Sequence, residues 1–182
     1  MKLDRKLLII LLIQITEVLG FSLILPFLPF YAQSLGASPL MVSLILSLFS
    51  LLQFISAPIL GRLSDVFGRK PLLIASQVST FISFLVLGRA TTLGMIFLSR
   101  AIDGALGSNY TIAQAYISDI SSKKDRSKAF GISGMAFGFG FLIGPAIGGY
   151  LSRFGFSVPA FVAAGIALVT IVLIGMLKPE VI

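Results

Sequence analysis

The sequence predicts an all-helical integral membrane protein, folded as one bundle of six transmembrane helices. Of its 182 residues, 57% are hydrophobic and only 12% are charged, whereas a soluble domain carries about 25% charged residues. The mean hydropathy is +1.04, and charged or turn-rich breaks leave apolar segments of about 20 residues, the length that crosses a bilayer. The period-two alternation of a membrane strand is absent, so helices are expected to satisfy the backbone within lipid.

The apolar segments lie near residues 7–31, 39–61, 70–88, 93–118, 127–151 and 156–177. The first follows a basic head that could be mistaken for a signal peptide, but Gln14 and Glu17 interrupt its apolar run and no small-residue cleavage site follows. In the same segment Pro26 and Pro29 each remove an amide donor and loosen the helix. The second segment ends at a charged stretch, the fourth contains charges at membrane depth, and the fifth is rich in glycine. The sixth has no charged residue, and we expect a single domain over residues 1–182.

Lysine and arginine are concentrated on one side of the predicted bundle. Of the 14 basic residues, two, Arg89 and Arg153, are expected on the opposite side. Basic loops remain in the cytoplasm, so both termini are expected to be cytoplasmic, in a cell membrane. The net charge of +7 is then a topology signal that also suits anionic lipid headgroups, and nucleic acid is not an expected partner. The residues on the basic side are Lys2, Arg5, Lys6, Arg62, Arg69, Lys70, Lys123, Lys124, Arg126, Lys128 and Lys178.

The chain contains neither cysteine nor histidine. It therefore has no disulfide framework and no thiolate metal site, and it lacks the side chain that is the commonest metal ligand and general base. No nucleophile motif is present either. We expect no enzyme activity, no metal and no cofactor.

The stretch GRLSDVFGRK, residues 61–70, places four charged side chains between two apolar segments. We expect a tight cytoplasmic turn here, in which the two glycines allow close backbone approach or positive φ. Solvated charges would serve topology alone, but topology requires neither an aspartate nor two glycines seven residues apart. The spacing of Gly61, Asp65, Gly68, Arg69 and Lys70 resembles the loop between the second and third helices of the major facilitator superfamily.

Three further stretches resemble the same superfamily in the expected order. LGFSLILPFLP, residues 19–29, is similar to the first helix of drug:proton antiporters, and Arg100, Gly104 and Gly107 resemble an intramembrane pattern of the fourth helix. GMAFGFGFLIGPAIGG, residues 134–149, resembles the glycine-rich antiporter helix, and AYISDISSKKDRSKAFG is similar to tetracycline-efflux proteins. The resemblance implies half of a twelve-helix transporter, built from two inverted three-helix repeats.

Three charged residues lie at membrane depth, where each costs at least about 2.5 kcal/mol on insertion scales. Glu17 has no charged neighbour within helical reach. The tetracycline-efflux resemblance implies a proton-binding carboxyl there, and an acid with a purely structural role is the alternative. Arg100 and Asp103 are three residues apart and can form an intrahelical pair. By resemblance, Arg100 instead faces the central cavity and modulates a proton-binding carboxylate, whereas Asp103 stands where the family pattern has a neutral residue.

The glycines of the fifth segment fall within about half of the helix circumference. Such a stripe lets two membrane helices approach closely, and Pro145 weakens the hydrogen-bond ladder so that the helix can bend. The resemblance implies a gating role for this helix, and simple packing is the alternative. The residues concerned are Gly134, Gly138, Gly144, Pro145, Gly148 and Gly149.

The resemblance also implies contacts on the cytoplasmic side. Asp119 is expected to pair with Arg69 and to fix spans two to four as a unit, with two independent solvated charges as the alternative. Asp65 is expected to face the positive end of a helix in the other half of the transporter. If the chain acts alone, a parallel homodimer would bring Asp65 to the start of span five in a second copy.

The function implied by the resemblance is a proton-coupled secondary transporter that exports small amphipathic organic molecules by alternating access, present as a half-transporter. Its partners would be the lipid bilayer, the substrate, protons and a second six-helix half. The alternative is a non-transporting membrane protein: an orphan half, an accessory or assembly subunit, or an inert fragment.

Overall fold

The computed structural model describes residues 5–177, with side chains from residue 7 onward. The basic residues Lys2 and Lys178 and the side chains of Arg5 and Lys6 lie outside the described part. Within it every regular element is a helix, which confirms the all-helical fold. The elements are α1 (Arg5–Ile24), α2 (Leu28–Ser34), α3 (Pro39–Phe67), α4 (Arg69–Gly88), α5 (Leu93–Leu106), α6 (Asn109–Ile120), α7 (Arg126–Leu151), the short 3-10 helix η1 (Ser152–Phe154) and α8 (Ser157–Gly175).

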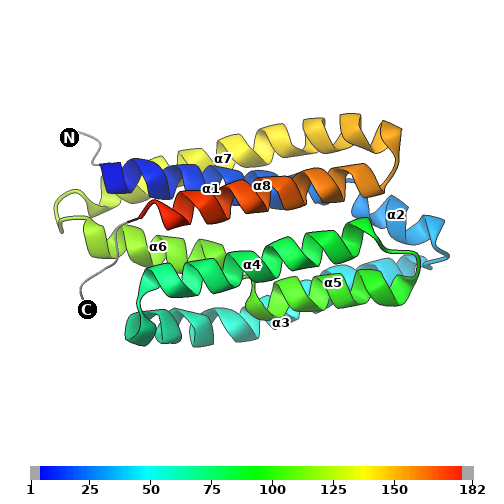
Figure 1. Cartoon of the computed structure of the whole chain (residues 1–182), viewed down its shortest axis with the longest axis horizontal. Coiled ribbons are helices and arrows are strands. Elements are labelled where there is room, and N and C mark those ends of the chain that lie inside the picture. The colour runs from blue at the N-terminus through cyan, green and yellow to red at the C-terminus, as the bar shows by residue number, and fades with distance from the viewer. Residues whose placement is uncertain (1–4, 178–182) are drawn as a thin grey trace.

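The long helices lie side by side in one elongated bundle (Figure 1). Helix α1 packs against α7 and α8, α8 packs against α4, and α5 packs against both α3 and α4. Helix α6 packs between these helices and contacts α1, α3, α4 and α7. Helices α1 and α4 are therefore central, and α3 and α7 form the two outer edges of the bundle.

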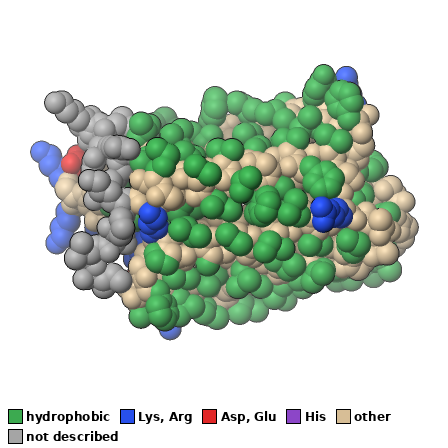
Figure 2. All heavy atoms as spheres, viewed as in Figure 1, with side chains coloured by type: hydrophobic (Ala, Val, Ile, Leu, Met, Phe, Trp, Pro, Cys, Tyr) green, Lys and Arg blue, Asp and Glu red, His purple; other side chains and the backbone are tan. Residues whose placement is uncertain are grey.

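Five helical segments in the described part of the chain are long and apolar enough to cross a membrane. The most apolar window of the first is 61% buried, but that of α3 is only 11% buried and that of α7 only 17%. Figure 2 shows hydrophobic side chains spread along the whole described length of one face of the bundle. This surface suits contact with lipid or with a further membrane-embedded partner, as expected for a multi-pass membrane protein.

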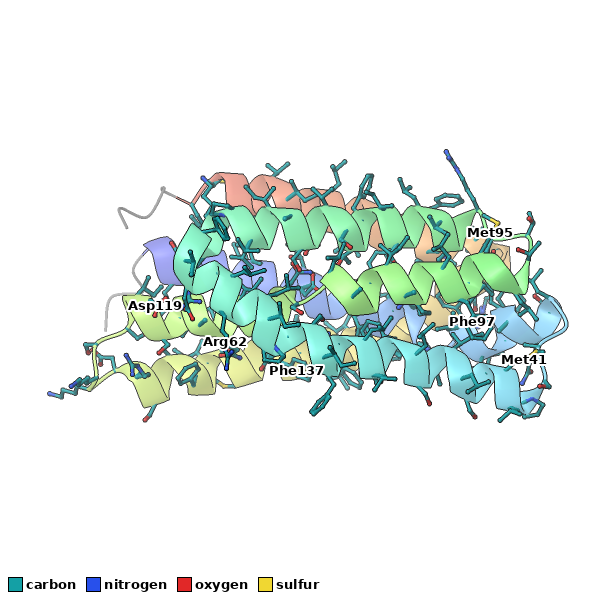
Figure 3. All side chains as sticks on the ribbon, turned by 90° about the horizontal axis from the view of Figure 1, so that it is seen from below. Met41, Arg62, Met95, Phe97, Asp119 and Phe137 are labelled. Carbon is teal, nitrogen blue, oxygen red and sulfur yellow. The ribbon has the colours of Figure 1, made fainter. Side chains whose placement is uncertain are left out.

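The connections α3–α4 and α6–α7 lie at one end of the bundle, hereafter the basic end (Figure 1). Arg62 and Asp119 lie toward this end, and Met41 and Met95 lie toward the other (Figure 3). The described ends of α1 and α8 are at the basic end too. The residues that give the basic end its charge are Arg62, Arg69, Lys70, Lys123, Lys124, Arg126 and Lys128.

The predicted first span, residues 7–31, is interrupted in the structure. Helix α1 ends at Ile24 and α2 begins at Leu28, and residues 25–27 form turns between them. The ring of Pro29 would meet the carbonyl of residue 25 in a continuous helix, and Pro26 has no amide hydrogen to donate. The two prolines thus divide the span, and the Tyr31 hydroxyl anchors α2 by donating a hydrogen bond to the Ala90 carbonyl at 2.7 Å.

The predicted fourth span, residues 93–118, is also divided, and here the sequence analysis expected a continuous helix. Helix α5 ends at Leu106 and α6 begins at Asn109. The break is possible at membrane depth because side chains of neighbouring helices satisfy the freed carbonyls. Ser76 donates to the Leu106 carbonyl at 2.7 Å, and Ser56 donates to the Gly104 carbonyl at 2.9 Å.

The predicted turn at residues 61–70 is much shorter than expected. Helix α3 continues through the charged stretch to Phe67, and α4 starts at Arg69, so Gly68 alone separates them. Gly68 has a φ of 93°, a conformation that costs a residue with a side chain far more than it costs glycine. The charged stretch is therefore mainly the last two turns of a helix.

Candidate functional site

A cavity of about 240 Å³ lies between the helices of the bundle and is partly open to the surface. Figure 3 places Phe137, one of its lining residues, about midway between the two ends. Six helices contribute to its walls, including both outer helices α3 and α7. The lining residues are Glu17, Val18, Phe21, Phe49, Gln53, Thr80, Phe84, Asp103, Gly107, Tyr110 and Phe137.

Glu17 and Asp103 are joined across the cavity wall by a chain of hydrogen bonds. Asn109 donates from Nδ2 to Glu17 Oε1 at 3.1 Å and is also 3.1 Å from Thr80 Oγ1. The Thr80 hydroxyl donates to Asp103 Oδ1 at 2.9 Å. This chain links Glu17 to Asp103 through two neutral residues, Asn109 and Thr80, that the sequence analysis did not identify.

Arg100 is not one of the residues that line this cavity, although the resemblance implies a position facing the central cavity. The residue is buried, with only 2% of its surface exposed. Its Nη1 lies 3.3 Å from Asp103 Oδ2, so the intrahelical pair left open by the sequence analysis is present. Its guanidinium lies 5.6 Å from the ring centre of Phe49 and 5.9 Å from that of Phe84. Arg100 thus holds one carboxylate and two aromatic side chains that line the cavity.

The remaining wall is largely aromatic. Phe21 and Phe49 stack with their ring centres 5.4 Å apart, and Tyr110 meets Phe137 edge to face at the same separation. These rings come from α1, α3, α6 and α7, so their meeting depends on the packing of helices that are far apart in sequence. The sequence analysis did not assign any of these residues to the site, because aromatic residues are common on every face of membrane helices.

Charged residues at the basic end form a compact cluster around Arg69. Arg69 donates from Nε to Asp119 Oδ2 at 2.8 Å and from Nη1 to Ser64 Oγ at 2.6 Å, and it also pairs with Asp65. The predicted pair of Arg69 and Asp119 is therefore confirmed. Gly61 contributes its carbonyl oxygen, which accepts a hydrogen bond from Ser64 at 2.6 Å. This cluster ties α3, α4 and α6 together.

Lys70 has a different role from its neighbour Arg69. Its ammonium group donates to the Gly175 carbonyl at 2.9 Å and also to the Leu177 carbonyl. Carbonyls at the end of a helix have no intrahelical partner and carry partial negative charge. Lys70 therefore caps α8 and fixes its end next to the start of α4.

The glycines of α7 fall into two groups, whereas the sequence analysis treated them as one stripe. A Cβ on Gly148 would lie 2.1 Å from the Leu23 carbonyl oxygen, and one on Gly144 would lie 1.8 Å from Ser22 Oγ. These two glycines therefore allow α7 to pack closely on α1. Gly134, Gly138 and Gly149 have no neighbour within 4 Å of an added Cβ. They are on the open surface of α7, and Pro145 lies within this unbroken helix.

Comparisons with known proteins agree with this architecture. The chain is 35% identical over 164 residues to a tetracycline resistance protein, class H, of Pasteurella multocida, covering 88% of this chain and 41% of that protein. It is also 35% identical over 171 residues to multidrug resistance protein 2 of Bacillus subtilis, covering 93% of this chain and 43% of that protein. The chain thus spans about two-fifths of the length of these relatives.

Among solved structures, the human organic anion transporter MFSD10 (TETRAN) superposes with a TM-score of 0.84 at 25% identity, covering 96% of this chain and 47% of that one. The family model described as Major Facilitator Superfamily matches residues 10–181. Because this match includes nearly all of the chain, the protein belongs to the major facilitator superfamily.

Proposed function

We propose that the protein is one six-helix half of a proton-coupled efflux transporter. The observation that carries this proposal is a carboxyl group, Glu17, in the wall of an aromatic cavity at mid-depth of a membrane bundle. Burying a carboxyl at this depth costs free energy, so a carboxyl that is present there is expected to serve a function. Ionised and protonated states of Glu17 would differ in their attraction for a substrate, which is what coupling of substrate movement to proton movement requires.

We infer that the substrate is a small amphipathic organic molecule with a planar or aromatic part. Rings from Phe21, Phe49, Tyr110 and Phe137 provide apolar contact area, and Gln53 and Glu17 provide polar groups in the same wall. A few polar groups in a mostly apolar wall are typical of sites for small organic ligands. The names of the relatives, tetracycline and multidrug resistance proteins, support the same class of substrate.

A second six-helix half is part of the proposal, because alternating access requires two bundles that move about one site. The open glycine surface of α7 and the exposed face of α3 are the surfaces on which we place it. Either a different polypeptide segment or a second copy of this chain could supply this half. In a parallel homodimer, Asp65, at the end of α3, would approach the start of α7 in the second copy, near Ser127.

If the homodimer forms, a chain that carries both Asp65→Cys and Ser127→Cys should form a disulfide between two copies, because the unmodified sequence contains no cysteine. After mild oxidation in native membranes, the double variant should migrate as a dimer in a denaturing gel, while either single variant should remain monomeric. Monomers alone, with folding verified by circular dichroism, would mean that a different six-helix half completes the transporter.

Transport itself is tested with purified protein in liposomes. With an acidic interior, an antiporter should accumulate labelled tetracycline or a labelled aromatic cation, and a protonophore should abolish the accumulation. Liposomes without protein, carrying the same gradient, are the control. Suppose that liposomes contain the dimer, as verified by cross-linking, and still show no gradient-driven uptake. This result would support the alternative, a non-transporting accessory half.

A further inference from the structure

A second polar cluster lies one helical turn from Glu17, toward the basic end. Gln14 precedes Glu17 by three residues on α1, so the two side chains share one face of the helix. Ser133 of α7 donates a hydrogen bond to Gln14 Oε1 at 2.7 Å and accepts one from Gln114 Nε2 of α6 at 3.0 Å. Gln14, Ser133 and Gln114 do not line the cavity.

Several buried polar atoms around Glu17 make no hydrogen bond in the described part of the chain. Glu17 lines the cavity, yet its Oε2 is buried and accepts none, and Gln14 Nε2 donates none. Gln77, whose amide lies beside the Glu17 carboxyl, has an unpartnered Oε1, and Asn109 has an unpartnered Oδ1. Gln14, Gln77 and Asn109 are each only 1% exposed. Buried polar atoms are rarely left without a partner in native proteins, so this group points to a small polar ligand.

We propose that these atoms form an ordered-water site on the buried side of Glu17, separate from the substrate cavity. The unpartnered amide and carboxyl atoms comprise one donor, Gln14 Nε2, and acceptors on three helices: Glu17 Oε2 of α1, Gln77 Oε1 of α4, and Asn109 Oδ1 and Gln114 Oε1 of α6. A buried water makes about three hydrogen bonds, and water can accept from the one donor while donating to two of the acceptors. The excess of acceptors favours a ligand that donates more hydrogen bonds than it accepts.

This inference rests on the proposed role of Glu17 as the proton-binding group. When Glu17 is ionised, the water donates a hydrogen bond to Oε2; when Glu17 is protonated, its Oε2–H donates to the water instead, and no covalent bond of the water is made or broken. The amides hold the water and neither gain nor lose a proton. The charged group that faces Glu17 is Asp103 of α5, which is paired with Arg100, while α4, α6 and α7 contribute the neutral side chains named above.

Toward the basic end the next layer of the core is apolar, formed by Ile10, Ile117 and Ala129. The site is therefore closed toward the basic end in this conformation. Such a site keeps the Glu17 carboxyl hydrogen-bonded to water while substrate occupies the cavity. If water reached the carboxyl only through the cavity, the carboxyl would lose this water when substrate binds.

The test is infrared difference spectroscopy of the protein in lipid, comparing Glu17 in its protonated and ionised states. An internal water bonded to Glu17 should give an O–H stretching band that shifts in water labelled with oxygen-18. The band should remain when excess tetracycline fills the cavity, and it should be lost in Gln14→Met. Thr170→Val is the control, because it removes another hydrogen bond to α1, the 2.7 Å contact with the part-buried Thr16, and should keep the band.

If Gln14→Met does not fold, Gln77→Met removes an acceptor and should also abolish the band. A band that persists in both variants would mean that these amides do not hold the water. A band that tetracycline displaces would place the water in the cavity. Either result would overturn the inference. The carboxyl band of Glu17 and transport would both remain in that case, so the proposed function would stand. If the wild-type protein shows the water band but no transport driven by a proton gradient, the proposed function is rejected instead.

Discussion

Replacing Glu17 by glutamine is expected to abolish uptake driven by a proton gradient while leaving the protein folded in the membrane. The substitution keeps the size of the side chain and leaves an oxygen that can accept the hydrogen bond from Asn109, which is 3.1 Å long in this structure. It removes the ability to bind and release a proton, together with the negative charge of the ionised carboxyl. Uptake of labelled substrate after a pH jump should fall to the level of liposomes without protein.

A matched control for this variant is Thr16→Val. Thr16 neighbours Glu17 in sequence, but its hydroxyl is hydrogen-bonded to that of Thr170 and it does not line the cavity. Gradient-driven uptake should therefore be retained in this variant. Substrate binding without a gradient separates coupling from recognition, because Glu17→Gln should still bind substrate in the aromatic cavity. Normal gradient-driven uptake by Glu17→Gln would remove this residue from the coupling mechanism.

Replacing Arg100 by methionine should produce the largest loss of stability among single substitutions in the site. The pair with Asp103 is buried, and removing one partner of a buried ion pair costs about 3–5 kcal/mol because the other charge is left uncompensated. The substitution also removes the guanidinium from between Phe49 and Phe84. Unfolding of the purified protein in mild detergent, followed by circular dichroism, measures this loss.

A double-mutant cycle separates the charge effect from the packing effect of Arg100. If the isolated carboxylate is the main penalty, adding Asp103→Asn to Arg100→Met should recover about 0.5–3 kcal/mol, the usual size of coupling between contacting residues. Equal stability of Arg100→Met and the wild-type protein would show that the ion pair contributes little. Additive losses in the double variant would assign the effect to the packing between the two rings.

Much of the fold was predictable because it depends on local composition and spacing. The apolar segments identify the helices, and the spacing from Gly61 to Lys70 identifies the superfamily without any knowledge of packing. The pair of Arg69 and Asp119 was predictable by resemblance. The break near Gly107 was not, because a helix can end inside a membrane only when other helices satisfy its carbonyls, here through Ser56 and Ser76.

The candidate site was predictable only in part, for a related reason. A carboxyl inside an apolar segment is conspicuous, and the resemblance implies an acidic residue at this point, so Glu17 is identified from the sequence. Asn109 is an ordinary polar residue in sequence and becomes part of the site only because α6 packs against α1. Arg100 was assigned to the cavity by resemblance, whereas in the structure it is paired with Asp103 and lies over the rings of Phe49 and Phe84.

The packing of α1 has a consequence for how the protein is made. Polar side chains of α1 find their partners on helices later in the chain: Glu17 on α6, Gln14 and Ser22 on α7, and Thr16 on α8. Synthesis proceeds from the amino terminus, so α1 leaves the ribosome well before those partners exist. The hydrogen bonds of α1 can therefore be completed only after α8 has been translated, so α1 enters the membrane before its polar side chains have these partners.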